Sequence, residues 1–144
     1  RSSDLDLAAT VRAINAGNYD ISISVHCDSS DSPSSRGAHV CHHRTYHDDG
    51  TCTDSVQGKD LAEAIAGPLC KLLPGRADHV QARPDRSCTP PKSSLYVLRK
   101  TNPPAVLVEC GFISNAGDTD LMKNNPAAIA RAIAWGVNTY TQRK

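Results

Sequence analysis

The chain has 144 residues, of which 39% are apolar and 22% charged, and its formal net charge is +1. This length fits one domain with one core, and the composition is that of a folded protein rather than a disordered one. Lysine and arginine are spread along the chain, which argues against nucleic acid as a partner because phosphate binding needs a concentrated basic face. No apolar run approaches the ~20 residues of a membrane-spanning helix, so no membrane span is expected.

The first half of the chain alternates between helical and strand patterns. Apolar residues at helical spacing predict a helix over residues 4–16, which Gly17 stops. Apolar residues that alternate with serines predict a strand over residues 21–26. A Ser/Asp/Pro loop, a second strand over residues 38–42 and a polar stretch up to residue 53 follow. Leucine and isoleucine at helical spacing from Leu61 to Leu73 predict the next helix, which ends at Pro74 and Gly75.

The second half predicts a buried strand between a loop and a helix. Residues 79–94 are rich in proline and predict an excursion, and Leu95–Leu98 is expected to form a short strand. Ala105–Val108 is continuously apolar, which is typical of a strand buried on both faces. Asn125 and Pro126 open the last helix as N-cap and first-turn residue. Strands that alternate with helices indicate an α/β fold, with helices on both faces of the sheet, in one domain over residues 1–144.

Two of the predicted strands end in reactive side chains. The first strand ends at His26, and the buried strand ends at Glu109. In an α/β sheet, functional groups gather beyond the carboxyl ends of the strands, so neighbouring parallel strands would bring the two together. An imidazole and a carboxylate there suit a metal site with an adjacent general base. A single histidine at a strand end is more often a structural residue, whereas a buried carboxylate needs a partner.

The two strands also carry a family resemblance. Ile21-Ser22-Ile23-Ser24-Val25-His26 resembles the strand of the zinc amidases of the Amidase_3 family that ends in a metal-binding histidine. The twelve residues from Pro104 to Asn115 resemble the family's segment with the catalytic glutamate, and the resemblance covers nearly all of the chain. It implies a twisted, mostly parallel sheet of the phosphorylase/hydrolase-like amidase fold.

The resemblance also implies an activity. His26 would be a Zn²⁺ ligand and Glu109 the catalytic acid/base of a peptidoglycan hydrolase. Such an enzyme cleaves the amide between the lactyl group of N-acetylmuramic acid and L-alanine of the stem peptide. The family's other two ligands, a histidine and a glutamate, lie upstream of the match to Arg1, so we expect a catalytic domain that is partial at its N-terminus. The resemblance implies peptidoglycan as the partner and a protein that acts as a monomer. The protein would work outside the cytoplasm or be a phage endolysin that acts on the wall.

The chain offers one zinc ligand, His26, whereas catalytic zinc normally has three protein ligands. Three alternative interpretations therefore stay open. Further ligands could be recruited from a nearby cluster, although a polar loop is the simpler interpretation of these residues: Cys41, His42, His43, His47 and Cys52. The chain could instead be a zinc carboxypeptidase-like peptidase. It could also be an inactive wall-binding or regulatory domain.

Six cysteines favour an oxidising compartment, and spacing alone allows 15 pairings. Cys27 and Cys110 follow His26 and Glu109 directly, where adjacent strands seldom aim two side chains at each other as a disulfide requires. The other four cysteines bracket loops of moderate length, so we predict the disulfides Cys41–Cys52 and Cys70–Cys88. Cys27 and Cys110 are expected to remain thiols.

Overall fold

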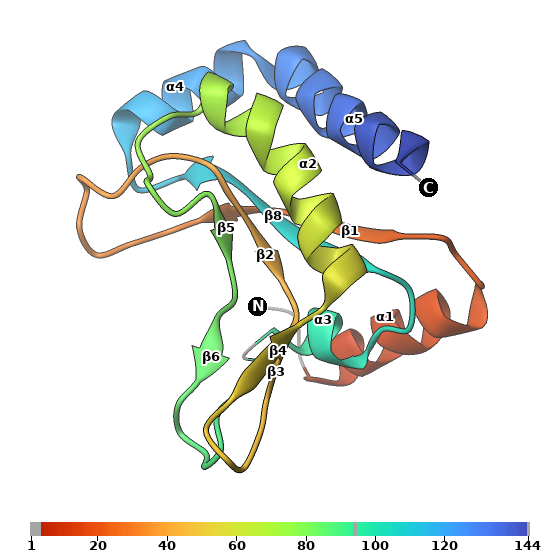
Figure 1. Cartoon of the computed structure of the whole chain (residues 1–144). Coiled ribbons are helices and arrows are strands. Elements are labelled where there is room, and N and C mark those ends of the chain that lie inside the picture. Colours follow the sequence, from red (N-terminus) through yellow and green to blue (C-terminus); the bar gives the residue numbers. More distant parts are fainter. Residues whose placement is uncertain (1–3, 94, 144) are drawn as a thin grey trace.

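The computed structural model describes residues 4–93 and 95–143 and places a four-stranded sheet between helices on its two faces (Figure 1). The strand order is β1–β8–β2–β5, with bounds Ser22–Asp28 for β1, Ala105–Phe112 for β8, His39–His42 for β2 and Val80–Gln81 for β5. Strand β8 runs parallel to β1 and antiparallel to β2, and β2 runs parallel to β5. The predicted α/β class is therefore confirmed, with one antiparallel pair in the sheet.

Strand β8 is the centre of the fold. All eight of its residues are buried, as its continuous apolar sequence predicts for a strand covered on both faces. Val106 and Val108 belong to the larger core cluster, whereas Leu107 belongs to a smaller cluster on the opposite face. Because side chains alternate along a strand, Glu109 lies on the face of Leu107.

The larger core cluster lies beneath helices α2 (Val56–Leu72) and α5 (Pro126–Gln142), which pack against each other (Figure 1). Helix α4 (Ala116–Asn124) continues this layer. Helices α1 (Asp4–Ala16) and α3 (Tyr96–Lys100) cover the other face. The helix over residues 4–16 and the last helix, with Asn125 as N-cap and Pro126 in its first turn, are confirmed.

A buried carboxylate anchors the end of β8. Asp118 of α4 is fully buried, and its Oδ2 accepts hydrogen bonds from the backbone N–H groups of Phe112, at 2.9 Å, and Gly37, at 2.7 Å. Gly111 has a φ of +129°, and a Cβ at this position would lie 3.0 Å from the same oxygen. Asp118 therefore joins the end of β8 to the loop before β2, and glycine lets the chain pass close to it.

Three sequence expectations need correction. The polar stretch before residue 53 contains a hairpin of β3 (Arg44–Tyr46) and β4 (Cys52–Asp54), and a second hairpin pairs β6 (Pro84–Asp85) with β7 (Lys92–Ser93). Residues Leu95–Leu98 do not form a strand, because Leu95 is the N-cap of helix α3. Four mainly apolar residues carry too short a pattern to distinguish strand from helix.

The predicted disulfides are also wrong, since the structure shows all six cysteines as free thiols. Cys41 is fully buried in β2 and packs with Leu107, whereas Cys52 is exposed on β4. Cys70 is buried, and its Sγ lies 3.2 Å from the carbonyl oxygen of Ala38. A disulfide would have to draw these two buried sulfurs out of the core. Cys27 and Cys110 are thiols, as expected.

Strand β1 forms one edge of the sheet, next to a surface rich in apolar side chains. Val25 on β1 and Trp135 on α5 are 58% and 67% exposed. A cavity of about 470 Å³ lies between β1, β8 and α5, lined mostly by apolar side chains. Within the described residues, no helix combines the length and hydropathy needed to cross a bilayer.

Candidate active site

The two reactive residues from the sequence meet at one position of the sheet. His26 of β1 and Glu109 of β8 are direct partners in the parallel pairing of these strands. His26 is exposed, while Glu109 is 6% exposed. The expectation that the two residues lie next to each other on parallel strands is thus correct, whereas the strands do not end there: β1 continues to Asp28 and β8 to Phe112.

Glu109 has the protonation behaviour of a group that can both take and give a proton near neutral pH. The pKa of Glu109 is raised from its ordinary 4.5 to about 7: burial is the main cause, the charge of Asp28 adds to the shift, and the charge of Arg83 opposes it. Its Oε2 is buried and has no hydrogen-bond partner among the residues that the structure describes. A carboxyl group with a pKa near the operating pH and one unoccupied oxygen suits general acid/base chemistry.

Arg83 joins three strand ends beside Glu109. It follows β5, and its Nη2 donates to Asp28 Oδ2 at 2.7 Å and to His39 Nε2 at 2.6 Å. Its Nη1 lies 3.8 Å from Glu109 Oε1. Burial, followed by the charges of Arg76 and Arg83, lowers the pKa of His39 to about 4, so the ring is neutral and can accept the hydrogen bond.

A cleft of about 880 Å³ opens over His26 and Glu109. Strands β1 and β8 contribute Ser24, His26, Leu107 and Glu109, and helix α3 contributes Tyr96, Val97 and Arg99. Helix α1 and the β6–β7 hairpin add residues at its borders, including Asp85 and Lys92. The cleft is thus lined by a mixture of apolar, polar and charged side chains, and a concave site with several polar groups can orient a polar ligand.

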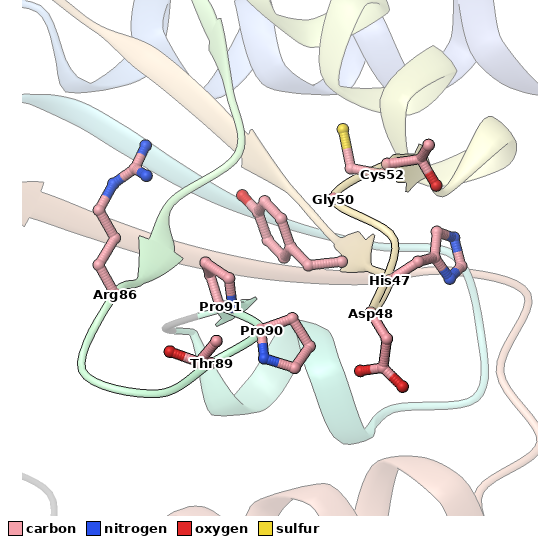
Figure 2. Close-up of a pocket in the computed structure, with 10 residues that line it drawn as sticks. His47, Asp48, Gly50, Cys52, Arg86, Thr89, Pro90 and Pro91 are labelled. Atoms are coloured by element: carbon pink, nitrogen blue, oxygen red, sulfur yellow. The ribbon is translucent and has the colours of Figure 1, made fainter.

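A second cavity, of about 460 Å³, lies away from these two residues. Figure 2 shows it between the turn that carries His47 and Asp48 and the loop that carries Arg86, Thr89 and Pro90. Neither His26 nor Glu109 lines this cavity. The candidate active site is therefore the cleft over β1 and β8.

The alternative cluster of metal ligands does not form. His43 Nε2 lies 3.2 Å from Thr45 Oγ1, and His47 Nε2 lies 2.8 Å from Thr53 Oγ1, both within the hairpin. Cys41, by contrast, is fully buried in the sheet. Over residues 4–93 and 95–143, no three side chains of His, Cys, Asp or Glu come together as a metal site. These residues alone do not fit the three-ligand set of catalytic zinc.

Sequence reasoning missed the residues that surround Glu109. Asp28 lies two residues after His26 on the same strand, but the pairing with β8 shifts register between these residues, so strand periodicity alone does not place Asp28 beside Glu109. His39 was included only as part of a predicted strand. No pattern in the sequence around His39 indicates that it pairs with Glu109 in the antiparallel pairing of β2 and β8. Arg83 lies in a loop, where the sequence gives no direction for its side chain.

The sheet places a cleft over a buried glutamate and a histidine on adjacent parallel strands, near the edge at which α/β folds bind their ligands. Residues 1–139 match the family model described as N-acetylmuramoyl-L-alanine amidase, Amidase_3. The chain therefore belongs to the Amidase_3 family, as the sequence resemblance indicated.

Relatives and solved structures of similar proteins agree with this assignment. The chain is 30% identical to the N-acetylmuramoyl-L-alanine amidase LytC of Bacillus subtilis, over 97% of this chain and 26% of LytC. It is 31% identical to the probable cell wall amidase LytH of Staphylococcus saprophyticus, over 97% of this chain and 40% of LytH. The catalytic domain of CwlV, an amidase from Bacillus (Paenibacillus) polymyxa var. colistinus, shares the fold with a TM-score of 0.72 at 24% identity, over 100% of this chain and 71% of that one. The chain thus spans less than half the length of either curated relative.

Proposed function

We propose that this chain contributes the catalytic glutamate of a peptidoglycan amidase that separates the lactyl group of N-acetylmuramic acid from L-alanine of the stem peptide. The observation that carries the proposal is the placement of Glu109, buried beneath the cleft with a pKa of about 7 and its Oε2 unpartnered among the described residues. Family membership supports the amide of peptidoglycan as the substrate. Since the curated relatives include cell wall amidases, we place the reaction outside the cytoplasm.

Glu109 would act as the proton carrier. As a carboxylate it accepts a proton at Oε2 from the water that attacks the scissile carbonyl, and it then donates that proton to the leaving amine of L-alanine. His26 would be one ligand of Zn²⁺. No group of three possible ligands forms among the described residues, so the zinc site would need ligands other than those that they bring together. The protein is proposed to act as a monomer.

The test is the release of new N-terminal L-alanine from purified peptidoglycan by the complete protein. Glu109→Gln should lower the rate by ~10²- to 10⁴-fold, because the amide cannot accept the proton. Glu63→Gln is the matched control, since Glu63 is an exposed glutamate on α2 and should leave the rate unchanged. A Glu109→Gln variant that keeps at least half of the wild-type rate would remove Glu109 from the mechanism.

The same incubation separates the alternatives. Release of free C-terminal amino acids without new N-terminal L-alanine would identify a peptidase, and binding without any release would identify a non-catalytic module. The zinc content of the complete protein, measured before and after His26→Ala, tests the metal independently of activity. An unchanged zinc content in that variant would exclude His26 as a ligand.

A further inference from the structure

The side chain of Arg83 contacts Asp28, His39 and Glu109. These three residues come from three different strands, β1, β2 and β8. Arg83 itself lies in the segment between β5 and β6, and its side chain is 31% exposed. A largely covered guanidinium attracts a neighbouring carboxylate more strongly than one in open solvent, because water screens the pair less.

The two terminal nitrogens of the Arg83 guanidinium contact different residues. Nη2 is occupied by Asp28 and by neutral His39, at 2.7 and 2.6 Å, and these two acceptors set the orientation of the planar group. Nη1 is thereby directed toward Glu109, where it lies 3.8 Å from Oε1. This distance is too long for a hydrogen bond, so the interaction is an electrostatic attraction between the two groups.

The two oxygens of Glu109 consequently have different surroundings. Oε1 faces the guanidinium, whereas Oε2 has no hydrogen-bond partner among residues 4–93 and 95–143. The attraction between the two charges favours the orientation of the carboxylate in which Oε1 is the oxygen nearer to Nη1. In that orientation Oε2 is the oxygen left available to a proton.

We propose that Arg83 is a positioning residue for Glu109. Its guanidinium, oriented by Asp28 and His39, holds Oε1 so that Oε2 is directed to the proton that is transferred. The inference rests on the proposed function, in which Glu109 carries that proton. Lysine could not replace Arg83 fully. Its single ammonium nitrogen cannot contact both the Asp28–His39 pair and Glu109 with the fixed geometry of the planar guanidinium.

The experiment measures kcat and KM on soluble peptidoglycan fragments with the complete protein and two variants, Arg83→Ala and Arg83→Lys. We expect Arg83→Ala to lower kcat by about 10²-fold, the typical cost of misplacing a catalytic group by ~1 Å, and to leave KM within about two-fold. Arg83→Lys should fall between Arg83→Ala and wild type. Millimolar guanidinium chloride, far below denaturing concentrations, should restore part of the kcat of Arg83→Ala and none of the kcat of Glu109→Gln.

Arg143→Ala is the matched control, because Arg143 forms an exposed pair with Asp60, 3.9 Å away on the helical layer. Its kcat should equal that of the wild type. A thermal unfolding curve for each variant checks that the fold is kept, and if Arg83→Ala does not fold, the kcat and KM of Arg83→Lys decide the question.

Three results would overturn the inference: kcat of Arg83→Ala within two-fold of wild type, a loss confined to KM, or a loss of kcat that guanidinium does not restore. If Arg83→Lys has to decide, a wild-type kcat overturns the inference as well. An inactive Glu109→Gln beside a fully active Arg83→Ala would reject only this inference. An active Glu109→Gln would reject the proposed function itself.

Discussion

Replacement of Glu109 by glutamine should change how the stability of the protein depends on pH. The pKa of Glu109 is raised from 4.5 to about 7 in the folded protein, chiefly by burial. A group whose pKa is raised by folding stabilises the fold fully below its unfolded pKa, and this contribution is lost as the pH rises through the folded pKa. At about 1.4 kcal/mol per pKa unit, ionising Glu109 in the fold costs up to about 3 kcal/mol between pH 4 and pH 8.

The assay is urea-induced unfolding of chelator-treated wild-type protein and Glu109→Gln at several pH values from 4 to 8. Titrating groups distant from Glu109 contribute to both proteins alike, so they cancel in the difference between the two free energies of unfolding, which leaves Glu109 and the groups coupled to it. The difference should move in favour of the glutamine variant by about 2–3 kcal/mol as the pH rises, with its midpoint between the unfolded and folded pKa values. A difference that stays constant within about 0.5 kcal/mol would refute the reasoning, because it would mean that burial does not disfavour the charged form of Glu109.

Three further predictions concern the framework around the site. Asp118→Ala removes the acceptor of two buried backbone N–H groups and should cost about 2–5 kcal/mol in urea unfolding, whereas a loss below 1 kcal/mol would show that water replaces the carboxylate. Gly136→Ala should destabilise the protein by about 1–3 kcal/mol, because a Cβ would lie 2.5 Å from Ile65 Cα where α5 crosses α2. Gly67→Ala, with nothing within 4 Å of its Cβ, is the control and should be neutral or stabilising. Equal changes in the free energy of unfolding for the two variants would contradict the close contact between Gly136 and Ile65. Thiol labelling of the unreduced, unfolded protein should modify all six cysteines. A pair of cysteines that stays unlabelled would show that the two form a disulfide.

Elements with long or uninterrupted patterns were predictable from the sequence. The helix over residues 4–16 shows helical periodicity along its whole length, and the strand that begins at Ala105 shows an uninterrupted apolar run. The β3–β4 and β6–β7 hairpins were missed because strands of two or three residues have no measurable period. Helix α3 was assigned as a strand for the same reason. Cysteine pairing was predicted from loop lengths, which do not reveal that Cys41 and Cys70 face the core.

For the site, the sequence by itself indicated that His26 and Glu109 lie side by side on adjacent strands, since each follows an apolar strand pattern directly. Only the tertiary structure decided what surrounds Glu109. His39 reaches it through an antiparallel pairing, and Arg83 reaches it from a loop 26 residues earlier in the chain. The physical reason is that a strand pattern reports burial along one segment, whereas the charge state of a carboxyl group depends on every group that folding brings to it. Burial, Asp28 and Arg83 together set the pKa of Glu109, and no local pattern contains all three.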